Sequence, residues 1–422
     1  MKTKENKQAA TKSGILITVL LFAFLSIGAC SKDEISVQQQ NTLNATDLPY
    51  PIAGTNQTMF YNDFDEISAP VKGQPFYGQD ANYPSNTPDY TDNGDGTITD
   101  NVTGLMWQKD PGEKMTYDEA VAGAKSFNLA GYTDWRLPTI KELYSLIIFS
   151  GLDPSGPNVT TADGLMPFIN TNYFVFNYGK AADGDRIIDS QFATSTLDVG
   201  GSQFGGGHLM FGVNFADGRI KGYPTGPRPG TTVSKKFYVL YVRGNENYGK
   251  NNFTDNDDGT VTDAATGLMW MQNDSGEGMN WKEALEYAEN KDFAGHNDWR
   301  LPTAKELQSI VDYSRAPGAT HSAAIDPVFH CTEITNEAGQ PDYPYFWSST
   351  THLSMLGGSR AVYVSFGRAL GYFNGVWQDV HGAGAQRSDP KTGDPNEFPY
   401  GRGPQGDAIR INNYVRLVRN VK

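Results

Sequence analysis

Tyr90-Thr-Asp-Asn-Gly-Asp-Gly-Thr-Ile-Thr-Asp100 is the stretch that decides the fold, because it returns as Phe253-Thr-Asp-Asn-Asp-Asp-Gly-Thr-Val-Thr-Asp263. The stretch that follows it, Thr103-Gly-Leu-Met-Trp107, returns as Thr266-Gly-Leu-Met-Trp270, again 163 residues later. Matching order and constant spacing across both stretches indicate an internal repeat.

The repeat continues outward from this stretch. Asp134-Trp-Arg-Leu-Pro-Thr139 returns as Asp298-Trp-Arg-Leu-Pro-Thr303, now 164 residues later, and Tyr238–Arg243 corresponds to Tyr414–Arg419 near the end of the chain. This period is far longer than that of solenoid repeats, so each copy is expected to be a whole domain. We predict module one at residues 89–246 and module two at residues 250–422.

Each module carries signals for two helices and several short strands. Capping-box pairs open the expected helices at Thr116 with Glu119 and Thr139 with Glu142, and the second module repeats both positions. The β-branched run at residues 96–99 predicts a strand that pairs with residues 105–107. We therefore expect an α+β fold class: two tandem modules, each with two helices packed on small antiparallel sheets and with long loops.

The N-terminal 29 residues have the pattern of a lipoprotein signal peptide. Four lysines precede the apolar run Ile15–Ile27, which is short for a membrane span and has the size of a signal-peptide core. Ser26-Ile27-Gly28-Ala29-Cys30 resembles the bacterial lipobox, which implies that Cys30 becomes an acylated N-terminus. An ordinary signal peptide that happens to contain a cysteine is the alternative.

Beyond Cys30, the sequence predicts a surface location. Ser31-Lys32-Asp33-Glu34 resembles the export signal of some outer-membrane lipoproteins, so we expect lipid anchoring in the outer membrane with exposure at the cell surface. Residues 30–88 are rich in Asn, Gln, Pro, Gly and Asp, a composition typical of a tether or loosely structured stalk.

Charge and cysteine content exclude whole classes of protein. The net charge is −14, and loss of residues 1–29 with their four lysines and one glutamate makes it −17. Because a chain with this much negative charge repels phosphate backbones, we expect no nucleic-acid partner. The two cysteines are Cys30 and Cys331, so acylation of the first leaves no internal disulfide.

The assembled motifs match a known family. The order Gly96-Thr-Ile-Thr-Asp100, Thr103–Trp107, Asp134–Thr139, a Trp-Ser-Ser-Thr run ending at Thr350, and a final Val415-Arg-Leu-Val-Arg419 resembles the Lcl C-terminal domain. More remotely it is similar to the formylglycine-generating enzyme superfamily, which implies a C-type-lectin-like fold. The founding Lcl domain is an adhesin module for sulfated polysaccharides, so the resemblance implies binding to a glycan.

Two departures limit that resemblance. The oxidase branch of the superfamily uses a copper-binding cysteine pair, and only Cys331 lies in a module, so this activity is excluded. Of the runs typical of calcium-dependent lectins, Glu-Pro-Asn and Trp-Asn-Asp are absent, and Gln-Pro-Asp occurs once, as Gln340-Pro-Asp342, without the accompanying Trp-Asn-Asp. Sugar binding through a lectin-type calcium ion is therefore not expected.

Other motifs favour structural roles. In the Asp-Trp-Arg-Leu-Pro-Thr runs, we expect buried Trp135 and Trp299, ion-paired Arg136 and Arg300, and helix-capping threonines, although a Trp-Arg pair also suits sugar and anion contact. Residues 255–259 suggest a structural calcium loop, but its twelfth position is Thr266 where glutamate is needed, and turn chemistry explains the run equally well.

Catalytic and metal motifs are absent from the sequence. His321, His330 and Cys331 fit no common zinc spacing, and no nucleophile elbow, His-Glu-x-x-His run or phosphate loop occurs. We therefore predict no enzyme activity and no cofactor.

The best candidate for ligand binding is the segment of about 47 residues that precedes the final strand of module two. Loops of this length in compact domains are usually functional or disordered. Aromatic faces stack on sugar rings while polar groups fix the hydroxyls, and the alternative is that the aromatics pin the loop to its own module. The predicted ligand-binding residues are Tyr372, Phe373, Trp377, Asp379, His381 and Arg387.

Two functions remain open at this point. The first is a surface adhesin that recognises a polysaccharide through these loops; anion binding would then require Arg360, Arg368, Arg387 and Arg402 to gather on one face, given the acidic chain. The second is a non-catalytic structural or accessory lipoprotein that binds another surface protein.

Overall fold

The structure is a computed structural model that describes residues 48–156, 159–201, 208–227 and 230–421. The predicted signal peptide, the lipidation site Cys30 and the first part of the tether lie outside these residues. Among the described residues, no helix has the length and apolar character needed to cross a membrane.

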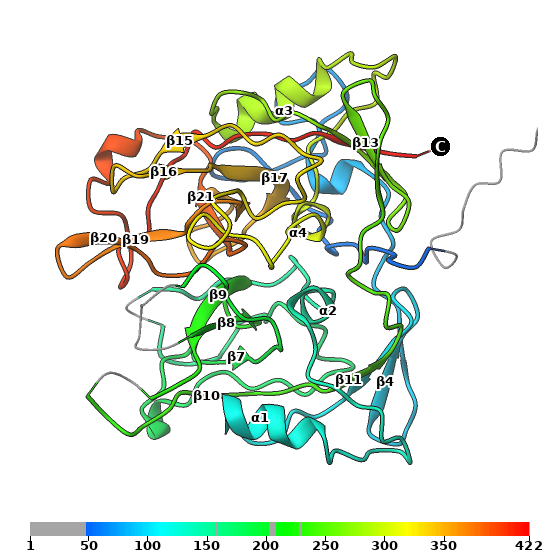
Figure 1. Cartoon of the computed structure of the whole chain (residues 1–422), viewed down its shortest axis with the longest axis vertical. Helices are drawn as coiled ribbons and strands as arrows, with labels where there is room; N and C mark the ends of the chain where they lie inside the picture. The colour runs from blue at the N-terminus through cyan, green and yellow to red at the C-terminus, as the bar shows by residue number, and fades with distance from the viewer. Residues whose placement is uncertain (1–47, 157–158, 202–207, 228–229, 422) are drawn as a thin grey trace, which may run out of the picture. The chain divides into compact units, whose positions relative to one another are not determined.

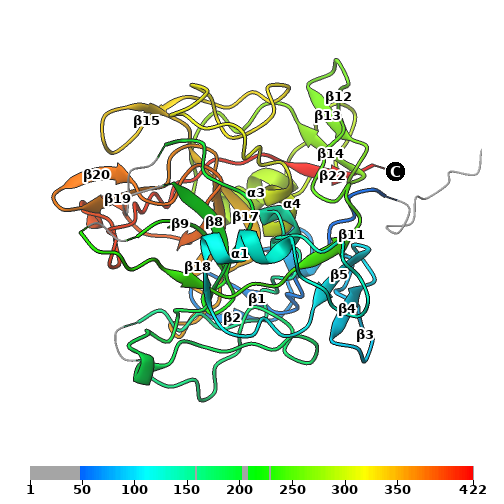
Figure 2. The same cartoon turned by 60° about the horizontal axis from the view of Figure 1, so that its bottom comes forward.

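Each module begins with a small antiparallel sheet built from the repeated stretch. The order in module one is β11-β5-β4-β3, and in module two it is β12-β13-β14-β22. Both sheets lie on one side of the fold, at the right of Figures 1 and 2. Their strands are β3 (Tyr90–Asp92), β4 (Thr97–Asp100), β5 (Leu105–Gln108), β11 (Val242–Gly244), β12 (Phe253–Asp255), β13 (Thr260–Asp263), β14 (Leu268–Met271) and β22 (Val418–Asn420).

A six-stranded antiparallel sheet joins the two modules. Its order is β17-β18-β21-β9-β8-β7, so three strands of module two continue into three strands of module one in mirrored sequence. The two halves meet where Gln386 of β21 pairs with Ile220 of β9. The strands are β7 (Gln191–Phe192), β8 (Leu209–Asn214), β9 (Arg219–Pro224), β17 (Tyr345–Thr351), β18 (Arg360–Ser365) and β21 (Gln386–Pro390).

Shorter elements complete the described chain. Two-stranded pairs form between β1 (Phe60–Tyr61) and β2 (Glu66–Ile67), β6 (Met115–Thr116) and β10 (Lys236–Phe237), β15 (Ile334–Thr335) and β16 (Pro341–Asp342), and β19 (Leu370–Phe373) and β20 (Val376–Asp379). Single turns of 3-10 helix are η2 (Asp80–Asn82), η3 (Ala181–Asp183) and η4 (Pro395–Glu397).

The predicted α+β class, with two helices per module packed on sheets in a C-type-lectin-like arrangement, is wrong. Strands in several small antiparallel sheets dominate the described part of the chain, and only about 10% of the described residues are helical. The described α-helices are α1 (Tyr117–Ala124), α2 (Ile140–Tyr144), α3 (Trp281–Glu289) and α4 (Ala304–Ser309). All four begin at the predicted capping boxes. They stop after one to three turns because a capping box fixes where a helix begins but not how far its apolar face continues.

The two modules share a core as well as a sheet. One cluster of buried side chains combines Ile140 and Phe149 of module one with Ala304 and Val362 of module two. Tyr313 of module two packs against Phe211 of module one at 4.9 Å between ring centroids. The described residues from 48 onward therefore form one compact unit.

Two lysines tie α2 and α4 together in a reciprocal way. The Nζ of Lys141 donates to the carbonyl of Ser309 at 2.7 Å, and the Nζ of Lys305 donates to the carbonyl of Ser145 at 2.8 Å. Lys141 corresponds to Lys305 and Ser145 to Ser309 in the repeat, each 164 residues apart. Such an exchange is the signature of a two-fold related interface, here formed within one chain.

The described end of the predicted tether, residues 48–88, is folded. Tyr50 is buried and its N–H donates to the carbonyl of Ala265. The side chain of Gln57 donates to the carbonyl of Thr351 at 2.8 Å and accepts from its N–H at 2.9 Å. This segment is therefore packed against the modules rather than extended as a loose stalk.

Candidate functional site

The Asp-Trp-Arg-Leu-Pro-Thr runs are structural, as predicted. Trp135 and Trp299 are buried, at 4% and 3% exposure. Arg300 forms a two-pronged ion pair with both carboxylate oxygens of Glu306 at 2.6 and 2.7 Å, and Arg136 donates from Nε and a terminal nitrogen to one oxygen of Glu142. Because these side chains face inward, the runs are not available for sugar stacking.

The segment of about 47 residues before the final strand is not a loop throughout. It contains the β19–β20 hairpin, which projects to the left in Figures 1 and 2, and the inner strand β21. Deleting residues 374–408 to test ligand binding would remove the central strand β21 of the shared sheet. Loss of binding after that deletion could then result from misfolding. Point substitutions are the appropriate test.

The six predicted ligand-binding residues separate into two groups. Tyr372, Phe373 and Trp377 lie on the hairpin, where Tyr372 pairs with Trp377 across the strands. The rings of Tyr372 and Trp377 meet edge to face at 5.4 Å. Asp379, His381 and Arg387 instead lie on the stretch from the end of the hairpin to strand β21, where the chain turns inward.

Two members of this group, His381 and Arg387, form a network centred on Asp407. The Nε2 of His381 donates to one carboxylate oxygen of Asp407 at 2.9 Å, and Arg387 forms a short ion pair with the other oxygen. Burial together with the nearby Arg387 lowers the pKa of His381 to about 4, so the ring is neutral at pH 7. Burial raises the pKa of Asp379 to about 7, and Gly382 donates its N–H to that carboxylate.

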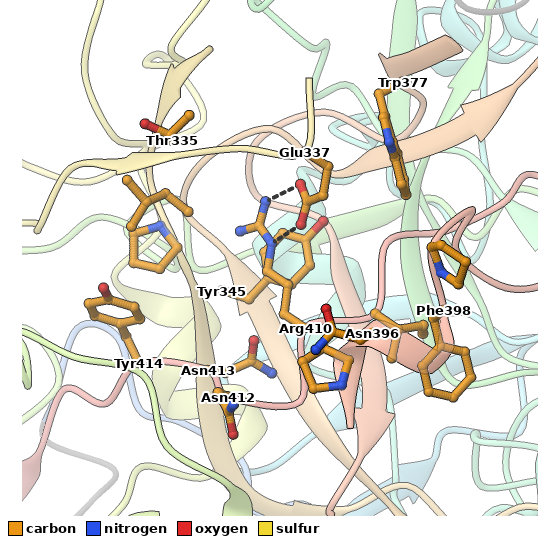
Figure 3. A pocket seen from close by; sticks show the side chains of 15 residues that line it. Thr335, Glu337, Tyr345, Trp377, Asn396, Phe398, Arg410, Asn412, Asn413 and Tyr414 are labelled. Atoms are coloured by element: carbon orange, nitrogen blue, oxygen red, sulfur yellow. Dashed lines mark hydrogen bonds and ion pairs between the residues drawn. The ribbon is translucent and has the colours of Figure 1, made fainter. Parts of the chain in front are cut away.

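Of the three predicted residues on the hairpin, Trp377 lines a cleft. The cleft has a volume of about 510 Å³ and lies between the hairpin, the β15–β16 turn and residues 395–414. Figure 3 shows Trp377 and Phe398 on one side of it and Tyr414 on the other. All three rings are half-buried, so each retains an accessible face or edge.

An ion pair lies in the middle of this cleft. Arg410 donates to Glu337 from Nε at 2.8 Å and from a terminal nitrogen at 3.0 Å, as Figure 3 shows. The guanidinium also lies 3.8 Å from the ring centroid of Tyr345. Despite burial, the hydrogen bonds and charge of Arg410 lower the pKa of Glu337, which keeps this carboxylate ionised and accepting.

A buried carboxylate shapes the floor of the cleft. Asp389 of β21 accepts from the backbone N–H of Arg410 at 3.0 Å, from that of Ile411 at 3.2 Å and from the side-chain amide of Asn413 at 3.2 Å. These bonds hold Ile411 at a positive φ of 60°. The kink leaves Asn412 exposed at the cleft while Asn413 is buried.

The sequence did not identify most of this cleft. Glu337, Asn396, Phe398, Arg410 and Asn412 come from three separate segments, and no local pattern relates them. The available signal was the density of aromatic, amide and glycine residues after residue 366.

Metal-binding geometry is not found in the part of the chain that the structure describes, where no group of three His, Cys, Asp or Glu side chains is arranged to hold an ion. In the suggested calcium loop, Asp255 accepts from the N–H of Asp257 at 2.9 Å and from the side chain of Gln272 at 2.8 Å. Asp258 accepts from Thr260. These bonds account for the turn without an ion.

Comparison with known proteins gives one result. The sequence model of the Lcl C-terminal domain matches residues 96–243 and again residues 259–381. No curated protein and no solved structure matches the chain.

Proposed function

The chain belongs to the Lcl C-terminal domain family, whose domain it carries in two tandem copies, and from this membership we propose that it is a surface protein that binds a glycan without catalysis. In this proposal the lipid on Cys30 holds the protein at the outer membrane. The modules are then presented at the cell surface, with the cleft beside Trp377 as the binding site.

The observation that carries the proposal is the composition of the cleft. Half-buried Trp377, Phe398 and Tyr414 offer flat apolar faces, and such faces stack on the apolar side of sugar rings. The exposed amides of Asn396 and Asn412 supply both donors and acceptors for hydroxyl groups. A concave site with aromatic walls and a few polar groups is the usual form of a small-ligand site.

The Arg410–Glu337 pair supports the same reading. Each member is already satisfied by the other, so the cleft presents a dipole with little net charge. That arrangement suits uncharged hydroxyl-rich ligands, because a hydroxyl can donate to Glu337 and accept from Arg410.

The test is Trp377→Ala in the full chain, screened on a glycan array beside the unchanged protein. Loss of a stacked indole is expected to weaken binding of the retained glycan about 10- to 100-fold, which corresponds to about 1.5–3 kcal/mol. The melting temperature should be nearly unchanged because Trp377 lies on a projecting hairpin.

Phe64→Ala is the matched control, since Phe64 is an aromatic residue that is 62% exposed and does not line the cleft. It should bind as the unchanged protein does. Equal glycan retention by Trp377→Ala and the unchanged protein would contradict the proposal. No glycan binding on the array, together with capture of a defined surface protein, would favour the accessory role instead.

A further inference from the structure

A second, larger cavity lies where the two modules meet. Its volume is about 930 Å³, and it is lined by β9 of module one, by β18 and β21 of module two, and by loops from both. Ile409 lines both this cavity and the Trp377 cleft, but the other lining residues differ. Each module supplies only part of the wall, so the cavity exists only when both are present.

The charge of this cavity is opposite to that of the protein. Seven lysine and arginine residues line it, against three aspartates, which leaves an excess of four positive charges. The whole chain carries −14. Three of the four arginines expected to form a basic patch are here, namely Arg360, Arg387 and Arg402, whereas Arg368 lies elsewhere and pairs with Asp342.

Part of this positive charge is neutralised within the protein. Arg219 pairs with Asp153 at 2.6 Å and with Asp217 at 3.2 Å, and Lys221 pairs with Asp217 at 2.7 Å. These ion pairs fix the side chains on one face of β9, where alternate residues point the same way.

Two arginines at the cavity have no carboxylate partner among the described residues. Arg360 donates to the carbonyl of Ser388 at 2.8 Å and makes no ion pair within 4.0 Å, and Arg402 is exposed without a side-chain partner. Burial, together with the nearby guanidinium groups of Arg219 and Arg402, lowers the pKa of Arg360 to about 10. Guanidinium groups that repel one another in a concave site are stabilised when an anion lies between them.

Two buried hydrogen-bond donors at the same cavity are also unpartnered. The hydroxyl of Tyr223 and the Nε of Arg219 have no hydrogen-bond partner within the described part of the chain. Both residues line the cavity from β9. A buried donor without an acceptor is destabilising, so a ligand whose oxygens accept from these two donors is stabilised by the new hydrogen bonds.

We propose that the cavity between the modules is a binding site for a compact ligand that carries at least two oxyanion groups. One group accepts from Arg360 and Arg402, and the other from the Nε of Arg219 and the hydroxyl of Tyr223. Phosphate, carboxylate and sulfate share the required chemistry of several acceptor oxygens with negative charge. The volume lies in the range of small-molecule sites, and the ligand bridges the two modules.

The test titrates the full chain with pyrophosphate, citrate and inositol hexasulfate by calorimetry at low ionic strength, with trehalose as a neutral probe. At least one anion is expected to bind saturably, and its affinity should fall as salt is added. The three anions distinguish phosphate, carboxylate and sulfate as the source of the oxygens. Saturable binding of trehalose alone, or of none of the four probes, would contradict the proposal.

Three variants locate the bound anion. Arg402→Gln and Arg360→Gln should each weaken binding about tenfold or more, equivalent to about 1.4 kcal/mol. Tyr223→Phe should weaken binding while leaving the melting temperature unchanged or higher, because it removes an unsatisfied buried hydroxyl. Weaker binding without a lower melting temperature would distinguish the loss of a ligand contact from a folding defect.

Arg368→Gln is the matched control, because it removes the same charge outside the cavity. It should bind the anion as the unchanged protein does. Equal loss of binding in Arg368→Gln and Arg402→Gln would mean that anion affinity depends only on net charge. That result would contradict the proposed site. Trp377→Ala should leave anion binding unchanged, so failure of this inference is distinguishable from failure of the proposed glycan cleft.

Discussion

The repeated Trp-Arg-Leu-Pro-Thr sequence determines the local structure around α2 and α4. Thr303 caps α4 by accepting from the N–H of Glu306, whose carboxylate accepts in turn from the N–H of Thr303 and from Arg300. One carboxylate thus satisfies a helix end and a buried guanidinium together. Removing its charge leaves Arg300 buried without a counterion, which is the costly way to break such a pair.

Glu306→Gln is therefore expected to lower the free energy of unfolding by about 3 kcal/mol near neutral pH. Despite burial, the charge of Arg300 lowers the pKa of Glu306 below its usual value. The stability from this group is thus complete above pH 5 and is lost as pH falls through the lowered pKa. Urea denaturation from pH 3 to pH 7 should show a weaker pH dependence in the variant over the acidic range.

Glu283→Gln is the control for this prediction. Glu283 occupies the same capping-box position in α3, but it is exposed and has no buried arginine partner. Its loss should change the free energy of unfolding by no more than about 0.5 kcal/mol. Equal effects of the two substitutions would show that the cap alone, rather than the Arg300 pair, accounts for the stability.

At the scale of elements, close backbone approach joins the two modules. Gly222 of β9 donates its N–H to the carbonyl of His381 in module two at 3.0 Å. A Cβ at this position would lie 2.8 Å from that oxygen and 2.8 Å from a methyl carbon of Leu209. Glycine is thus required here by contact with the partner module.

Gly222→Val should destabilise the protein by about 2 kcal/mol, since overpacking at a close approach forces the two strands of the junction apart. Thermal unfolding followed by circular dichroism measures the effect. Gly226→Val is the control, because no atom lies within 4 Å of a Cβ at Gly226. A stability loss shared equally by both variants would contradict a specific role of the junction.

The elements also show what the sequence could and could not predict. Helix starts were predictable because a capping box is a local signal of four residues. Strand β21 was not, because Gln386-Arg-Ser-Asp-Pro390 lacks apolar alternation. Its polar side chains are buried because Asp389 and Arg387 are satisfied by residues 407–413, and such long-range partners leave no local pattern.

In the candidate cleft, too, residues with a local sequence signal were predictable and residues that depend on long-range partners were not. Trp377 was predictable because an aromatic residue among glycines in a long segment suggests a binding surface. Glu337 and Arg410 were not, since 73 residues separate them and the bend at Ile411 that presents Arg410 depends on the buried Asp389. Burial and long-range hydrogen bonds, rather than local secondary-structure propensity, determine where Glu337 and Arg410 lie.

At the scale of the whole molecule, the two family domains behave as one folded body. The mirrored strand order of the six-stranded sheet, the reciprocal lysines on α2 and α4, and the shared core all join residues more than 150 positions apart. Residues 48–88 add contacts to both modules, since the N–H of Tyr50 donates to Ala265 of module two and the side chain of Gln57 donates to the carbonyl of Phe149 of module one at 3.4 Å. The cavity with the excess positive charge depends on this union.

Differential scanning calorimetry of the full chain tests this union most directly. A shared sheet and core predict a single unfolding transition in which the calorimetric enthalpy equals the van't Hoff enthalpy. Two separable transitions, one for each module, would contradict the claim that the repeats form one cooperative body.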